Sequence, residues 1–188
     1  KPTEADDLNS MLLSDATGHF LMNLLEMVWY DDDKNMDRIR DYWGPKYFEG
    51  VRDYLSQKIF FTSLVACPTL ENIEVTKKQA ETCVDRVNKL IYQVDPLLVV
   101  CLGSVAGKYI LGYGDAPTNR GMIKEFTIES PYSGRRVRYA GMITHHPKHL
   151  MNAGDQNLVS QRRGLTYNTM ENIRKALNIL KIHKELQT

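Results

Sequence analysis

Cysteine is scarce in this chain of 188 residues, which has three, an odd number. A secreted fold held together by disulfides uses a denser and even set, and secretion also requires a leading apolar segment that is absent here. No apolar run approaches the roughly 18 residues that span a membrane. We therefore expect a reducing compartment, cytoplasmic or nucleoid-associated, and no membrane as a partner.

The chain also has little net charge, +1 at pH 7, but its charges are unevenly distributed. Residues 1–50 carry five Lys or Arg against eleven Asp or Glu, whereas residues 119–163 carry eight against three. Such a basic segment either binds a polyanion on one face of a neutral protein or is a solvated surface. Charge alone leaves both interpretations open.

The composition, 43% hydrophobic and 25% charged, is that of a globular protein. A chain of this size buries roughly 70% of its unfolded surface, which sustains a core without disulfides. We expect one domain over residues 1–188. Because the first residue is Lys1 and not Met, we also expect the native protein to carry a further N-terminal segment, and a larger chain or a replication or repair complex is one context for it.

Apolar spacing predicts the secondary structure. Helical periodicity follows Thr76, where Gln79 completes a capping box, and it ends before Asp95. Runs of aromatic and β-branched residues with few charges predict buried strands. The predicted elements are helix 17–28, a weaker helix 45–55, strand 59–66, helix 77–94, strand 97–102, short helix 104–112, strands 122–128 and 136–143, and a helix from 166. This order predicts an α/β fold, a three-layer α/β/α sandwich with a central, mostly parallel four-stranded sheet.

Three segments follow predicted strands at the edge where an open parallel sheet binds ligands, residues 63–68, 102–104 and 144–150. The last segment holds three of the five histidines of the chain, His145, His146 and His149. Imidazole donates hydrogen bonds near pH 7 and stabilises a developing anion. A metal site and a chance cluster of histidines are the alternatives.

Four segments resemble a known family. They are Thr62–Pro68 (TSLVACP), Cys83, Val94–Ala106 (VDPLLVVCLGSVA) and Thr144–Pro147 (THHP). In this order they resemble the uracil-DNA glycosylase superfamily, closest to its iron–sulfur type, family 4, over about residues 13–180. The resemblance implies hydrolysis of the N-glycosidic bond of a uracil or modified base flipped out of DNA.

The resemblance also implies roles for individual residues. His146 matches the histidine that contacts the carbonyl oxygen of the base, and Leu150 or Met151 matches the wedge that enters the DNA stack. Ser104 opens a helix where backbone donors receive a phosphate. The DNA-binding set that we expect is Ser104, Lys148, His149, Leu150, Met151, Arg162 and Arg163.

The same resemblance implies a cofactor. Cys67 and Cys83 match two of the four thiolate ligands of a 4Fe-4S cluster, and the other two are expected in a C-x-x-C segment upstream of Lys1. Cys101 lies inside a predicted strand, where it is expected to be a small buried hydrophobe.

The chain departs from the family at the base-binding residues. Ser63 stands where the family reads the uracil edge with an asparagine, and Leu13 lies where an aromatic ring stacks on the base. One hydroxyl makes fewer hydrogen bonds than a planar amide, and leucine lacks ring stacking. These departures predict weak or altered activity on uracil, unless Ser63 only caps the end of its strand.

The family's water-positioning segment, G-E-A-P-G, has no match in the chain, and we expect that residue upstream of Lys1. The function that the sequence predicts is a DNA glycosylase of base excision repair, with DNA as its partner. The alternative is a DNA-binding module or a subunit of a replication or repair protein that kept the fold and lost the chemistry. The sequence leaves the target base open.

Overall fold

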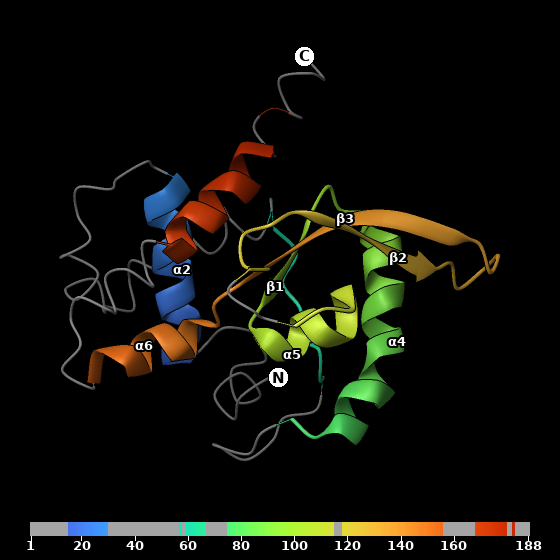
Figure 1. Ribbon diagram of the computed structural model, residues 1–188, viewed down its shortest axis with the longest axis horizontal. Coiled ribbons are helices and arrows are strands. Elements are labelled where there is room, and N and C mark those ends of the chain that lie inside the picture. Colours follow the sequence, from blue (N-terminus) through green and yellow to red (C-terminus); the bar gives the residue numbers. More distant parts are fainter. Residues whose placement is uncertain are drawn as a thin grey trace. The chain divides into compact units, whose positions relative to one another are not determined.

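The computed structural model describes residues 15–29, 57, 59–66, 75–114, 118–155, 168–179 and 182 (Figure 1). The chain divides into two compact units, Lys1–Ile73 and Glu74–Thr188. Within the described residues, no helix is both long and apolar enough to cross a membrane. A single domain over the whole chain stays a prediction.

The first unit contains helix α2, Ala16–Trp29. Asp15 caps its start, because the Asp15 carboxylate accepts a hydrogen bond of 2.7 Å from the Gly18 N–H. The five apolar residues that set the predicted periodicity are all buried, Phe20, Leu21, Leu24, Leu25 and Val28. The helix is therefore confirmed, whereas the weaker helix predicted at 45–55 lies outside the described residues.

The strand predicted at 59–66 is wrong. These residues form an irregular segment with a bend at 64–65, and Phe60 has 57% of its surface exposed. Only Val65 is buried within the run. Aromatic and β-branched composition describes what suits a half-buried strand, but it does not supply the partner strand that a sheet requires.

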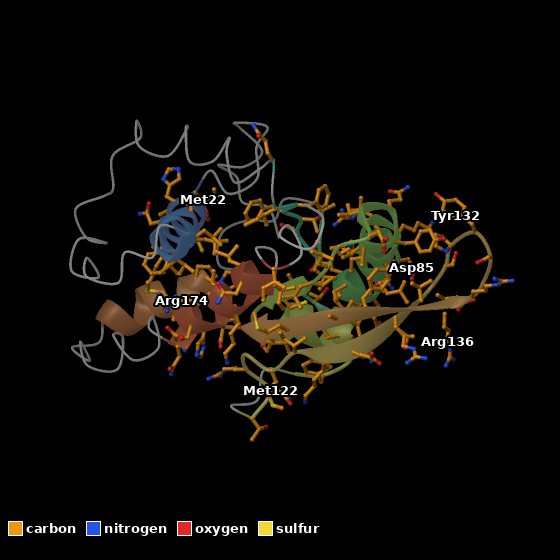
Figure 2. All side chains as sticks on the ribbon, turned by 90° about the horizontal axis from the view of Figure 1, so that it is seen from above. Met22, Asp85, Met122, Tyr132, Arg136 and Arg174 are labelled. Carbon is orange, nitrogen blue, oxygen red and sulfur yellow. The ribbon has the colours of Figure 1, made fainter. Side chains whose placement is uncertain are left out.

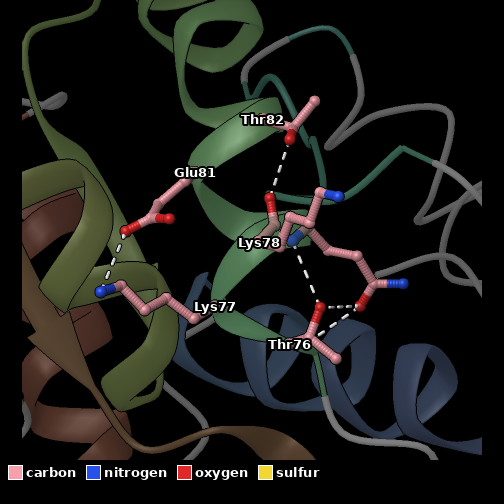
Figure 3. A network of polar contacts seen from close by, with 6 residues as sticks. Thr76, Lys77, Lys78, Glu81 and Thr82 are labelled. Atoms are coloured by element: carbon pink, nitrogen blue, oxygen red, sulfur yellow. Dashed lines mark hydrogen bonds and ion pairs between the residues drawn. The ribbon is translucent and has the colours of Figure 1, made fainter.

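The second unit begins with helix α4, Lys77–Val94, and its predicted capping box is confirmed (Figure 3). The Thr76 hydroxyl accepts from the Gln79 N–H at 3.3 Å, and the Gln79 side chain accepts from the Thr76 N–H at 2.9 Å. The helix ends at Asp95, whose N–H donates to the Ile91 carbonyl at 2.9 Å. The apolar face buries Ala80, Val87 and Ile91.

The sheet has three strands within the described residues, in the order β1-β3-β2 (Figure 1). Strand β1, Val99–Leu102, is parallel to β3, Arg136–Thr144, and β2, Lys124–Glu129, is antiparallel to β3. The described residues thus form a mixed three-stranded sheet, and the predicted four-stranded, mostly parallel sheet is not shown. The short turn between β2 and β3 permits only a hairpin, since a parallel crossover needs a dozen or more residues.

Basic and acidic side chains lie near one another on the hairpin of β2 and β3. Arg138 lies 3.6 Å from Glu125, and Arg136 is opposite Glu129 in the strand register. At the tip, the ring of the exposed Tyr132 packs against Tyr92 of α4, with centroids 5.8 Å apart and planes tilted by 55°. Tyr132 and Arg136 point to opposite sides of the hairpin (Figure 2). Two arginines of the basic segment thus lie near glutamates of the neighbouring strand.

Helical segments surround the carboxyl ends of β1 and β3. Helix α5, Ser104–Ala106, continues as the π-helix η2, Gly107–Leu111, and stops at Gly112 in a left-handed conformation, as predicted. Helix α6, Pro147–Asp155, follows β3. A last helix covers 168–179 and buries the predicted apolar residues Met170, Ile173 and Leu177.

Gly121 sits at a tight contact between the last helix and β3. Its N–H donates to the Ile143 carbonyl at 2.9 Å, and its φ is +67°. A Cβ at this position would overlap the side-chain amide of Asn172. That amide is buried and donates to the Thr144 hydroxyl at 3.2 Å. The end of β3 thus depends on a residue without a side chain at position 121.

We expect Gly121→Ala to lower the free energy of unfolding by about 2–4 kcal/mol, because it adds left-handed backbone strain and displaces a buried hydrogen-bonded amide. Gly112→Ala is the matched control. Its φ of +79° carries the same strain, but nothing lies within 4 Å of the added Cβ. Urea denaturation should show a loss of about 1–2 kcal/mol for the control, and equal losses would contradict the proposed overlap.

Candidate active site at the carboxyl ends of β1 and β3

Strands β1 and β3 end side by side. Leu102 pairs with Thr144 in the parallel register, and the Gly103 N–H then donates to the Thr144 carbonyl at 2.8 Å. The turn at 103–104 and the histidine loop, defined as residues 144–150, therefore leave the sheet at the same edge. Two of the three segments predicted at this edge are together. The third, 63–68, begins in the other unit and continues beyond the described residues.

Gly103 packs closely against the side chain of His146 at this junction. Its φ of 89° and ψ of 171° lie in a region that is essentially restricted to glycine. A Cβ on Gly103 would stand 3.1 Å from the His146 Cβ, which is tighter than ordinary contact. The backbone at the end of β1 thus passes directly against the histidine.

His146 is the residue before helix α6, and its ring is tied to the first turn of that helix. The His146 Nδ1 accepts a hydrogen bond of 3.2 Å from the Lys148 N–H, and its carbonyl accepts from the His149 N–H at 2.9 Å. A backbone N–H can only donate, so Nδ1 has no proton. The neutral ring therefore carries its proton on Nε2, and the exposed side chain presents an N–H donor.

The side chain of His145, unlike that of His146, is buried, with 3% of its surface exposed. Its ring stacks on the ring of His149, with centroids 5.7 Å apart and planes 24° from parallel. The Arg120 guanidinium approaches its Nε2 at 3.4 Å. Across the residues that the structure describes, no group of three His, Cys, Asp or Glu side chains is placed to hold a metal ion. The metal interpretation of the histidines thus gains no support.

The remaining predicted DNA contacts differ in exposure. Ser104, Lys148 and His149 are exposed, whereas Leu150 is completely buried. Of the two candidate wedge residues, only the half-buried Met151 reaches the surface. Four predicted site residues lie outside the described part of the chain, Leu13, Cys67, Arg162 and Arg163.

The cysteines do not complete a cluster site. Cys101 is buried in β1, and burial raises the pKa of its thiol to about 12, so it stays protonated at neutral pH. Cys83 is half-buried on α4. A 4Fe-4S cluster takes four thiolates, whereas the three cysteines of the chain leave at most Cys67 and Cys83 available. Cys67 and Cys83 would therefore supply two of the four thiolates that the cluster takes.

Two contacts of this site were not predicted from the sequence. Arg120 was counted only as a basic charge, and the buried pair of Thr144 and Asn172 was not singled out. The signal for Arg120 was the glycine after it, which allows a close approach to β3. The contact with His145 spans 25 positions in the sequence, which no local pattern reveals.

Gly103→Ala should displace His146, because the added Cβ meets the histidine and the backbone conformation excludes a side chain. We expect the largest NMR shift changes at residues 144–148 and a loss of about 1–3 kcal/mol in unfolding free energy. Gly114→Ala is the control, since nothing lies within 4 Å of that position. Shift changes confined to residues 103–107, with His146 unmoved, would contradict the close contact.

The family model described as the uracil DNA glycosylase superfamily matches residues 1–178. No curated protein matches the chain. The matched range covers nearly the whole sequence, including both strand ends and the histidine loop, and the chain accordingly belongs to the uracil DNA glycosylase superfamily.

Proposed function

We propose that this protein is a DNA glycosylase that hydrolyses the N-glycosidic bond of a flipped uracil or modified base. The observation that carries the proposal is the position of His146, an exposed imidazole donor at the carboxyl ends of two parallel strands in a chain of this superfamily. Ligands of open α/β sheets bind at such an edge. The proposed product is DNA with an abasic site.

The role proposed for His146 follows from the charge that develops in the reaction. Water adds to the sugar carbon, the glycosidic bond breaks, and its electron pair leaves with the base, which takes up a proton afterwards. A preorganised donor stabilises this developing anion without the cost of reorientation. The Lys148 N–H fixes the His146 ring with its proton on Nε2, which is the nitrogen proposed to face the base carbonyl.

The proposed DNA contacts surround this donor. Lys148 and His149 are exposed in the first turn of α6, and Ser104 is exposed at the start of α5. A base must be extruded from the duplex before its glycosidic bond is accessible, and a wedge lowers the cost of unstacking. We propose Met151 for the wedge, and Arg162 and Arg163 as further contacts with phosphates.

The base specificity proposed for the site depends on Ser63. Its hydroxyl would meet the base edge with fewer hydrogen bonds than a planar amide makes. A site that leaves a polar edge unpaired discriminates less well by about 1–3 kcal/mol. Altered activity on uracil, with preference for another base, is therefore part of the proposal.

His146→Ala should lower the rate of single-turnover base release by about 10²-fold or more, because it removes the proposed donor from the transition state. DNA affinity should change little. Release is measured by alkaline cleavage at abasic sites in duplex and single-stranded oligonucleotides that contain uracil or another deaminated base. His149→Ala is the matched comparison, since it removes an exposed imidazole three residues away, and its loss should be smaller.

Equal losses from the two variants would indicate collapse of the loop and would contradict a specific role for His146. DNA binding without base release from any of these substrates would replace the glycosylase by the alternative function, a DNA-binding module that keeps the fold.

We further propose that Cys67 and Cys83 are two thiolate ligands of a 4Fe-4S cluster whose remaining ligands come from outside the three cysteines of this chain. The native full-length protein, purified without oxygen, should contain iron and absorb broadly near ~400 nm. Cys83→Ser should abolish both signals, whereas Cys101→Ala should retain them. Iron-free wild-type protein would remove this proposal.

A further inference from the structure

We propose that Arg120 is a positioning residue of the active site, which holds His145 in one neutral tautomer and thereby fixes the segment that carries His146. The consequence for catalysis rests on the proposed function, whereas the consequence for the His145 ring does not. The proposal starts from the guanidinium, which approaches the His145 Nε2 at 3.4 Å.

The backbone of Arg120 is fixed to the end of β3. Arg120 forms a parallel bridge with Ile143, and the Gly121 N–H donates to the Ile143 carbonyl at 2.9 Å. This short pairing lies beyond the end of β2, which pairs with β3 only as far as Gly141. The side chain of Arg120 is therefore delivered to the end of the strand where the histidine loop begins.

The loop that carries Arg120 is braced on its other side. The Lys124 ammonium donates to the Asn119 side-chain oxygen at 2.6 Å and lies 4.8 Å from the centre of the Tyr113 ring. Asn119 in turn donates to the Gly114 carbonyl at 3.0 Å, and the Tyr113 hydroxyl donates to the Gly141 carbonyl at 3.3 Å. These contacts restrict the backbone on both sides of Arg120.

The chemistry of the guanidinium decides the tautomer of His145. A guanidinium has N–H donors and no acceptor, so the Nε2 that faces it must be the unprotonated nitrogen. The neutral ring then carries its proton on Nδ1. A second proton on Nε2 would face the positive charge of Arg120 and would remove the acceptor. His145 and His146 are thus assigned opposite tautomers, because their partners donate to different ring nitrogens.

The His145 ring orients its neighbour through the chain. Successive side chains of an extended segment point to opposite sides, and His145 is buried where His146 is exposed. A ring locked by Arg120 on one side and stacked on His149 on the other cannot rotate without moving this segment. Arg120 accordingly acts on His146 from the inner side of the loop.

Replacement of Arg120 separates this role from a general effect on stability. Arg120→Met removes the donors and keeps an unbranched apolar stem, whereas Arg120→Lys restores a charged donor without the planar fork. Arg174→Met is the matched control. Arg174 is also half-buried, but it lies on the helix 168–179 and pairs there with Glu171.

The decisive readout is the tautomer of His145, measured by long-range ¹H–¹⁵N correlation on protein with ¹⁵N-labelled histidine. The His145 signals are assigned by their loss in His145→Gln. Wild type should show a protonated Nδ1 and an unprotonated Nε2 at His145. Arg120→Met should place the proton on Nε2 in part or completely. Arg120→Lys should retain the wild-type pattern at least in part, and the control Arg174→Met should retain it completely.

Single-turnover base release gives the second readout. Arg120→Met should lower the rate at saturating protein by about tenfold or more, with little change in the protein concentration for half-maximal rate, since a misplaced group costs rate and not binding. Arg120→Lys should recover part of the rate. A wild-type His145 with the proton on Nε2, or a tautomer unchanged by Arg120→Met, would overturn the proposal. If wild type released no base but the tautomer responded as expected, the proposed function would fail and the role of Arg120 at His145 would stand.

Discussion

The parallel pairing of β1 with β3 is the constraint on which the candidate site depends. It brings the carboxyl ends of the two strands to one edge, and the bond from the Gly103 N–H to the Thr144 carbonyl extends the pairing by one step. A single hydrogen bond contributes only about 1 kcal/mol. The bond matters mainly for the position of Gly103, because it holds this glycine against the side chain of His146.

The two neighbouring histidines illustrate how one loop serves two purposes. His145 turns inward, where burial and the Arg120 guanidinium leave it a neutral acceptor at Nε2. His146 turns outward and caps α6, where the Lys148 N–H leaves it a neutral donor at Nε2. The Arg120 guanidinium and the Lys148 N–H therefore assign different tautomers to the buried and the exposed ring.

Local signals predicted the local structure well. The capping box of Thr76 and Gln79, the end of α4 at Asp95 and the buried face of α2 all depend on residues within a few positions of one another. The strand predicted at 59–66 was wrong because a strand also needs a distant partner, which composition does not encode. The turn between β2 and β3 was visible in the sequence, and its length permits only an antiparallel pairing of these two strands.

In the candidate site, too, local features could be predicted from the sequence and contacts between distant residues could not. His146 and the turn at 103–104 could be located, since both follow predicted strands in a motif of the superfamily. Arg120 could not, because its contact with His145 joins residues 25 positions apart. The complete burial of Leu150 was also hidden, since it depends on which side of α6 faces the rest of the protein.

The most direct measurement is the protonation of the His146 ring in the folded protein at neutral pH, read from the ¹⁵N shifts of its two nitrogens. The bond from the Lys148 N–H predicts a neutral ring with an unprotonated Nδ1 and the proton on Nε2. A proton on Nδ1, in either a neutral or a charged ring, would contradict the role of His146 as a preorganised neutral donor.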